Sequence, residues 1–191
     1  MFDALNLWEA HILAWIESLR GPVLTPAVRF FTHLGDSGLL FIVLTLFLLA
    51  FPKTRKVGLA TALALLCSLL FTNLILKNLF QRERPWEVVD FLHNLVFETD
   101  TSFPSGHTSA AFAFALAFVR SDFKGRWAKV TVVVVAVLMG LSRLYVGAHY
   151  PTDVLVGFVV GDLAGLTGWY LSTRLVRAFQ RTGPPTDKPS E

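Results

Sequence analysis

The segment Val57–Leu76, with the sequence VGLATALALLCSLLFTNLIL, contains no charged side chain. A helix of about 20 mainly apolar residues is long enough to cross the hydrocarbon core of a bilayer. Four further apolar runs flank this segment, over Gly38–Phe51, Thr108–Val119, Val130–Leu141 and Val154–Leu171. The sequence therefore predicts an all-α, integral membrane helical bundle of five transmembrane helices.

The composition also indicates a membrane protein and a single domain. Of the 191 residues, 53% are hydrophobic and 16% are charged, whereas soluble domains contain about 25% charged residues. The net charge is only +3, and the cations do not form the dense patch of a nucleic-acid-binding surface. Cys67 is the only cysteine, so an intramolecular disulfide is excluded. We expect no nucleic-acid partner.

Residues 1–35 have a different pattern. Apolar side chains, two tryptophans among them, recur there at helical spacing opposite polar ones such as Glu9. Gly21 and Pro22 interrupt this helix before a second helical stretch over about Thr25–His33. We expect two amphipathic helices that lie on the outer leaflet of the membrane. A sixth transmembrane span is the alternative.

The charges of the loops predict the topology. Five alternating spans place three short basic segments on one side of the membrane, which the positive-inside rule identifies as cytoplasmic. The other loops, which carry the polar motifs described next, then lie on the outer side. The three segments hold ten of the 17 Lys and Arg residues: Lys53, Arg55, Lys56, Arg120, Lys124, Arg126, Lys129, Arg174, Arg177 and Arg181.

The first polar motif follows the second predicted span. Lys77 ends this span, and Arg84 comes seven residues later, directly before Pro85. Proline disfavours helical backbone at the preceding residue, so we expect the chain to turn and bring Arg84 toward Lys77. Both cations suit phosphate oxygens; the alternative is that they snorkel to the membrane interface. We expect Arg82 and Glu83 to form a solvated local pair outside the site.

The second motif, Pro104-Ser105-Gly106-His107, precedes an Ala- and Phe-rich run. Free backbone N–H groups at a helix start bind anions, and Gly106 allows a ligand to approach the backbone closely. His107, in the first turn, is placed to give a proton to a leaving oxygen. The alternative is an ordinary serine cap beside an interfacial histidine.

The third motif is Ser142-Arg143 followed by His149 and Asp153. His149 and Asp153 share a helix face if Pro151 lies in the first turn, where proline is tolerated. A carboxylate at one ring nitrogen fixes the tautomer and makes the other nitrogen a better nucleophile. One alternative is a capping aspartate beside a surface histidine. Another is a Zn²⁺ site on the histidines and Asp153, which the nearby cations disfavour.

Read together, the three motifs match K-x6-RP, PSGH and SR-x5-H-x3-D in that order. With them the chain resembles the type 2 phosphatidic acid phosphatase (PAP2) superfamily over about residues 37–172. We expect one domain over residues 1–181. It would comprise interfacial helices over 1–35 and a transmembrane core over 37–172, followed by a disordered tail over 182–191.

The resemblance implies a two-step reaction that needs neither a metal nor another cofactor. His149 would attack the phosphorus atom to form a phosphohistidine, with Asp153 orienting its ring. His107 would protonate the leaving group and then activate water. The residues implied to hold the phosphate are Lys77, Arg84, Ser105, Gly106 and Arg143.

Among the members of this superfamily, small bacterial enzymes with an outward-facing site are most similar. We expect a plasma-membrane enzyme that converts undecaprenyl pyrophosphate to undecaprenyl phosphate, which recycles the cell-wall lipid carrier. Phosphatidylglycerophosphate and phosphatidic acid are alternative substrates, and a phosphate-lipid binding or transport protein is the non-enzymatic alternative. Trp86, Phe91 and Phe103 either line a lipid entrance or are ordinary interfacial aromatic residues.

Overall fold

The computed structural model describes residues 3–182, and these form helices and loops without a strand. The all-α prediction is therefore confirmed for the described range. The helices in chain order are α1 (Asp3–Glu17), α2 (Leu24–His33), η1 (Asp36–Gly38), α3 (Leu39–Ala50), α4 (Arg55–Ser68), the π-helical η2 (Leu69–Leu76), α5 (Lys77–Phe80), α6 (Pro85–Val88), α7 (Gly106–Arg120), α8 (Arg126–Tyr145) and α9 (Pro151–Thr182).

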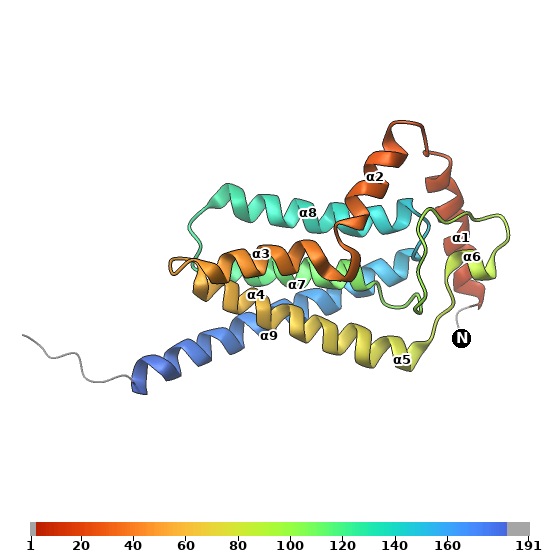
Figure 1. Cartoon of the computed structure of the whole chain (residues 1–191). Helices are drawn as coiled ribbons and strands as arrows, with labels where there is room; N and C mark the ends of the chain where they lie inside the picture. The colour runs from red at the N-terminus through yellow and green to blue at the C-terminus, as the bar shows by residue number, and fades with distance from the viewer. Residues whose placement is uncertain (1–2, 183–191) are drawn as a thin grey trace, which may run out of the picture.

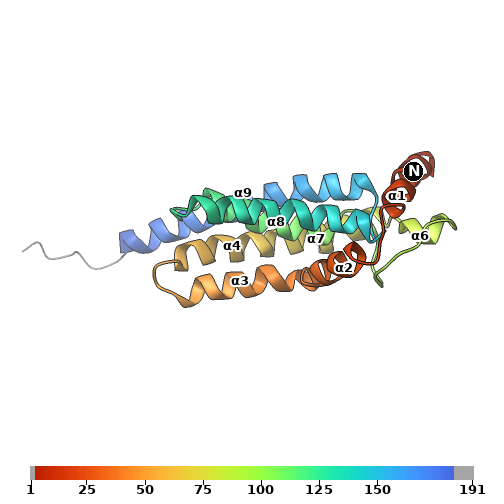
Figure 2. The same cartoon turned by 90° about the horizontal axis from the view of Figure 1, so that it is seen from above.

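Helices α3, α4, α7, α8 and α9 lie along one another and form the bundle (Figures 1 and 2). Helix α7 contacts α4, α8 and α9, and its buried face is rich in alanine. Small residues also allow α9 to approach its neighbours closely. A Cβ atom added to Gly161 would lie 2.5 Å from the Ser109 carbonyl oxygen, and one on Gly168 would lie 2.3 Å from the Ala64 nitrogen.

Three segments contain helix that is long and apolar enough to cross a membrane: Arg55–Val88, which runs from α4 to α6, Arg126–Tyr145 and Pro151–Arg181. Helices α2 and α3 form a fourth candidate span, which bends by 48°. Helix α7 has 15 residues, so at about 1.5 Å per residue it is shorter than the apolar core of a bilayer. The chain is thus a multi-pass membrane protein, and the count of five or six spans stays a prediction.

The helices extend beyond the apolar runs into the motifs. Helix α7 begins at Gly106 and α9 at Pro151, so the second motif and Asp153 of the third lie at helix starts. Ser142 and Arg143 of the third motif lie near the C-terminal end of α8. At its other end α9 continues to Thr182, well past the predicted end at Leu171. Thr182 ends α9, and the rest of the tail predicted to be disordered, residues 183–191, lies outside the described range.

The N-terminal segment forms the two predicted helices, separated by a turn around residues 18–23. Helix α1 lies across the end of the bundle, near α6 (Figure 1). Its buried Ala10 and Leu13 pack with residues of the α6–α7 region and Tyr150, whereas Trp8 and Trp15 are each 64% exposed. An exposed tryptophan-containing face suits a membrane interface, and the interfacial position of α1 stays a prediction.

The two ends of the bundle differ in chemistry. The α3–α4 turn, the α7–α8 loop and the C-terminal part of α9 lie at one end (Figure 1). These segments, with the adjoining ends of α4, α7 and α8, carry the ten predicted cytoplasmic cations. The starts of α7 and α9 and the end of α5 lie at the other end, with α1 and α6. The motif residues are therefore gathered at the end of the bundle opposite the basic loops.

Candidate active site

The backbone after α5 turns as the sequence predicted. Gln81 adopts a left-handed conformation with φ 43° and ends α5. Arg84 is extended, with φ −81° and ψ 158°, and α6 starts at Pro85. This turn brings Arg84 to the same carboxylate, that of Asp100, that Lys77 contacts. The first motif thus forms one cationic cluster rather than two separate interfacial charges.

Three cations, Lys77, Arg84 and Arg143, form what we call the cation cage, and each is paired with a carboxylate of the α6–α7 loop (residues 89–105). Lys77 Nζ and Arg84 Nη2 donate to Asp100, and Arg143 Nη2 donates to Glu98. The cation side chains are between 0% and 8% exposed, whereas Asp100 is 48% and Glu98 21% exposed. The cage therefore binds anionic oxygens, and the carboxylates that now occupy it, those of Glu98 and Asp100, are more exposed than the cations.

Further contacts fix the two guanidinium groups. Arg84 Nη1 donates to the Ala148 carbonyl oxygen at 2.8 Å, and Arg143 Nη1 donates to Thr32 Oγ1 at 2.7 Å. Among the described residues, no acceptor lies within bonding distance of the buried Arg143 Nε. Burial acts to raise the pKa of Asp100, but the hydrogen bond and charge of Lys77 and the charge of Arg84 lower it to about 2. Asp100 is therefore anionic at neutral pH.

His149 and Asp153 come together at the start of α9. Their Nδ1 and Oδ2 atoms are 3.6 Å apart, which is slightly long for a hydrogen bond. Ser102 Oγ lies between them, donating to Asp153 Oδ2 at 2.5 Å and lying 3.5 Å from His149 Nδ1. Burial, followed by the charges of Arg84 and Arg143, lowers the pKa of His149 well below its usual range. His149 is thus a neutral imidazole, the form required of a nucleophile.

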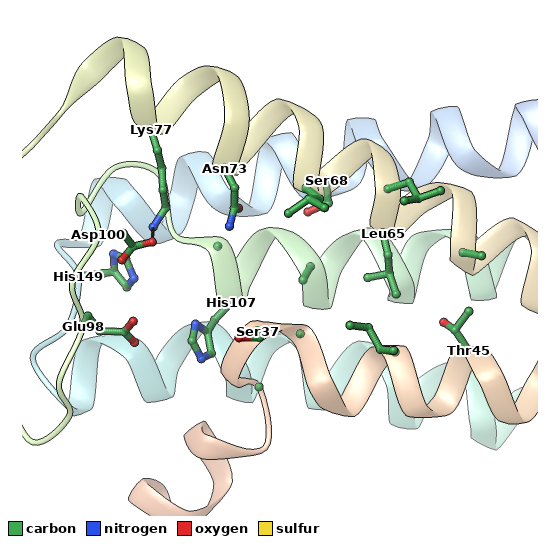
Figure 3. A pocket seen from close by; sticks show the side chains of 18 of the residues that line it. Ser37, Thr45, Leu65, Ser68, Asn73, Lys77, Glu98, Asp100, His107 and His149 are labelled. Atoms are coloured by element: carbon green, nitrogen blue, oxygen red, sulfur yellow. Dashed lines mark hydrogen bonds and ion pairs between the residues drawn. The ribbon is translucent and has the colours of Figure 1, made fainter.

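His107 lies in the first turn of α7 and lines the same cavity as His149 (Figure 3). Its Nε2 is 3.0 Å from Asp36 Oδ1, a carboxylate from the segment between α2 and α3. Ser105 is buried and caps α7, accepting a hydrogen bond from the Thr108 hydroxyl at 2.9 Å. Ser105 therefore shapes the helix start that presents Gly106 and His107, and its direct contact with phosphate stays a prediction.

Among the described residues, one group could supply ligands to a metal ion: Asp36, Glu98 and His107. Their ligand atoms lie within 4.8 Å of one another. Asp36 already contacts His107, and Glu98 pairs with Arg143. A cation bound here would also face the positive charge of the cage. The donor set therefore fits a divalent metal poorly, and it differs from the two-histidine, one-aspartate set considered from the sequence.

A cavity of about 590 Å³ extends from the cage along helices α3 and α4. Figure 3 shows Lys77, Glu98, Asp100, His107 and His149 at one end, and residues of α3 and α4 along the rest. The lining of that second part is mainly apolar, and none of Trp86, Phe91 and Phe103 belongs to it. Its apolar residues are Ile42, Leu46, Leu49, Ala62, Leu65, Leu66 and Leu69.

Several site residues were not predicted from the sequence. Arg82 was expected to be solvated beside Glu83, and this is wrong: it is 2% exposed and pairs with Glu9 and Asp153. Asp100 was not predicted either, because an acidic residue in a polar loop gives no signal of its own. The other missed residues are Asp36, Glu98 and Ser102.

The chain is similar to known proteins over the range that contains the candidate site. The model of the PAP2 superfamily matches residues 55–177, a range that contains all three motifs. The putative undecaprenyl-diphosphatase YbjG of Escherichia coli is 35% identical over 129 residues, covering 66% of this chain and 62% of that relative. This chain thus spans less than two thirds of that relative's length.

Two more relatives match over larger shares. The undecaprenyl-diphosphatase BcrC of Bacillus subtilis is 32% identical over 158 residues, covering 82% of this chain and 79% of that relative. The crystal structure of a transmembrane PAP2-type phosphatidylglycerolphosphate phosphatase from Bacillus subtilis superposes with a TM-score of 0.73 at 29% identity. It covers 94% of this chain and 90% of that one.

Proposed function

This chain belongs to the PAP2 superfamily, and on that premise we propose that it is a metal-independent lipid phosphatase acting through a phosphohistidine intermediate. The observation that carries the proposal is the continuity of the cavity from the cation cage to an apolar part between α3 and α4. Its volume, about 590 Å³, falls within the range of small-molecule sites. It suits a phosphate headgroup and the first part of a chain whose remainder stays in the bilayer.

In the proposed first step, His149 attacks the phosphorus atom and the bond to the leaving oxygen breaks. Because Nδ1 faces Asp153 and Ser102, Nε2 is the nitrogen available for attack. His107 gives its proton to the leaving oxygen. The cage cations, with Ser105 and the Gly106 N–H, hold the other phosphate oxygens as negative charge develops on them.

In the proposed second step, His107 accepts a proton from water as the water oxygen attacks the phosphohistidine. The P–N bond breaks, and inorganic phosphate and neutral His149 are released. Asp36, 3.0 Å from His107 Nε2, would hold the ring in place and stabilise its protonated form. Asp153 would do the same for His149 while that ring carries the phosphoryl group.

As substrate we propose undecaprenyl pyrophosphate, in keeping with two of the relatives described above. We also propose that the site lies on the outer face of the plasma membrane, which favours this substrate because the pyrophosphate form of the carrier is released there. The positive-inside rule gives that orientation, since the basic loops lie opposite the site. Phosphatidylglycerophosphate and phosphatidic acid are the alternative substrates, and the name of the solved relative favours the first of these.

Phosphate release from purified protein tests the activity. We expect undecaprenyl pyrophosphate to exceed a soluble phosphomonoester in kcat/KM at matched surface concentration, with EDTA having no effect. His149→Ala is the control, because it leaves the cage intact. A glycerophospholipid preferred by more than about tenfold, or 1.4 kcal/mol in barrier, would replace the proposed substrate. Binding of these lipids without turnover would favour a binding or transport protein.

Sidedness is tested separately in a Cys67→Ala background. Asp90 lies in the α6–α7 loop and Lys124 in the α7–α8 loop, and both side chains are exposed. We expect Asp90→Cys to react with an impermeant thiol reagent added to intact cells, and Lys124→Cys to react only after permeabilisation. The reverse pattern would place the site on the cytoplasmic side.

A further inference from the structure

A chain of buried charges runs from the proposed nucleophile's partner to helix α1. Arg82 Nη1 donates to Asp153 Oδ1 at 2.5 Å, and Arg82 Nη2 donates to Glu9 Oε2 at 2.6 Å. Glu9 and Asp153 are 0% exposed and Arg82 2%. Helix α1 lies outside the range matched by the family model, residues 55–177. The chain of charges therefore connects the region matched by the family model to an N-terminal helix of this protein.

Hydrogen bonds hold this cluster in one arrangement. Glu9 Oε1 accepts from the Thr152 backbone N–H at 2.6 Å, and Glu9 Oε2 accepts from the Thr152 hydroxyl at 2.9 Å. Asn6 Oδ1 accepts from Arg82 Nε at 3.0 Å and from Nη2 at 2.6 Å. The guanidinium carbon also lies 3.9 Å from the centre of the Tyr150 ring. Glu9 thus contacts both Arg82 and the residue that precedes Asp153.

The charge of Glu9 has a consequence for His149. Arg82 paired with Asp153 alone would form a neutral pair and leave little negative potential for an imidazole that becomes cationic. With Glu9 present, the cluster has a net charge of −1. Such buried ionic clusters are weak contributors to stability, because desolvation offsets their attraction. A role in tuning the site is therefore a better account of this cluster than a purely structural one.

We propose that Glu9 and Arg82 are positioning residues, which act through Asp153 to orient His149 and to supply negative charge behind it. Helix α1 is then a working part of the enzyme. This inference rests on the proposed phosphohistidine reaction, in which His149 gains positive character. Neither Glu9 nor Arg82 lines the cavity, so their substitution should change kcat far more than KM.

The charges around His149 determine the direction in which Glu9→Gln should shift the pH dependence of the rate. Removing the Glu9 charge disfavours protonated His149, so its pKa should fall and the acid limb of the rate profile should move to lower pH. The effect of Glu9 adds to those of the groups that already face His149 or its cage: Lys77, Arg84, Arg143, His107, Asp153, Glu98 and Asp100.

The main test is the isosteric Glu9→Gln variant. We expect kcat to fall roughly 10- to 100-fold, the loss known for hydrogen-bond partners of metal-ligating histidines, with KM nearly unchanged. The acid limb should move down by about one pH unit. Glu17→Gln on the same helix is the matched control, since Glu17 pairs with Arg20 and His93 instead. A lower melting temperature with unchanged kcat and pH profile would overturn the inference.

A second substitution relocates the charge. Asn6→Asp in the Glu9→Gln background returns a carboxylate to Arg82 with little change in shape, and it should restore most of kcat and the position of the acid limb. Asn6→Asp alone should move the limb to higher pH, so the inference is testable even if Glu9→Gln does not fold. No rescue and no shift in either variant would overturn it.

Failure of the proposed phosphatase function can be distinguished from failure of the Glu9 inference. If the proposed function is wrong, the wild-type protein releases no phosphate from any of the lipids tested. In that case the ¹⁵N-histidine NMR titration of His149, assigned with His149→Ala, is the deciding measurement. Its pKa should be lower in Glu9→Gln than in wild type and unchanged in Glu17→Gln. Equal values in all three proteins would overturn the inference whatever the substrate is.

Discussion

Arg82 and Arg84 are two residues apart and equally well buried, yet they face different surroundings. Arg84 lines the cavity and pairs with Asp100, whose side chain is 48% exposed. Arg82 lies behind Asp153 and pairs with two carboxylates that are both 0% exposed. An anionic ligand in the cavity can compete with Asp100 for Arg84, whereas the buried partners of Arg82 lie outside the cavity lining. One short segment thus supplies both a ligand-binding cation and a supporting one.

The largest expected loss of activity comes from substituting His149 or Asp153, which lie between the surroundings of Arg84 and those of Arg82. His149→Ala should abolish turnover, because it removes the nucleophile, while the cage still binds vanadate. Asp153→Asn should leave a weak residual rate, since an amide favours the wrong tautomer; in serine proteases the analogous change costs about 10⁴-fold. Rates of phosphate release by purified variants decide this. Near-normal turnover by His149→Ala would remove the phosphohistidine from the mechanism.

The next prediction compares the two arginines directly. Arg84→Gln should weaken inhibition by vanadate by about 2 kcal/mol, roughly 30-fold, as expected for a lost hydrogen bond to a charged group. Arg82→Gln should leave the inhibition constant within about threefold and lower kcat instead, because its side chain does not reach the ligand. Both constants are measured on the same lipid substrate. Equal weakening of vanadate binding in the two variants would show that Arg82 also belongs to the cage.

The two arginines also differ in how well their surroundings could be predicted from the sequence. The apolar helices and the three motifs were predictable because apolar length and fixed spacing are local signals. The structure brings Lys77, Arg84 and His149 to one cavity. Arg82 was misread because nothing near it in the sequence shows its partner: Glu9 is 73 residues away. Burial that depends on such a distant contact appears only when α1 packs on the end of the bundle.

The carboxylates of the α6–α7 loop follow the same logic. Glu98 and Asp100 lie in a polar loop, where acidic side chains are normally expected to be exposed to solvent. In the structure they pair with the cage because three buried cations without a bound anion would be strongly destabilised. The apolar part of the cavity was equally unforeseen, since the side chains from α3 and α4 that line it look like any lipid-facing leucines.

A smaller effect is expected from removing a displaceable partner of Arg84. Asp100→Asn should strengthen inhibition by inorganic phosphate and vanadate by about tenfold, because the ligand no longer competes with a carboxylate for Lys77 and Arg84. Asp90→Asn is the matched control, being the same change at an exposed position of the same loop. Weaker inhibition in Asp100→Asn would instead mean that Asp100 orders the cage for its ligand.

The smallest expected effect is a shift in the pH dependence of the rate. Substitutions in the cage and in the cluster behind Asp153 should shift it in opposite directions. The pKa of His149 is lowered well below its usual range, first by burial and then by Arg84 and the other cage cations. The neutral nucleophile therefore persists as pH falls through 6.5, the ordinary histidine value, and activity is lost only as pH falls through the lowered pKa. The acid limb of kcat/KM, which reports the free enzyme, should thus lie below pH 6.5.

Charge removal then shifts this limb in opposite directions. Arg84→Gln removes a positive charge that disfavours protonated His149, so the limb should move to higher pH. Glu9→Gln, on the far side of Asp153, should move it to lower pH. Ionisation of the substrate is the same in every profile, so differences between variants report the protein alone. Shifts of the same sign in both variants would mean that the cage and the cluster behind it act on His149 through structural change rather than through charge.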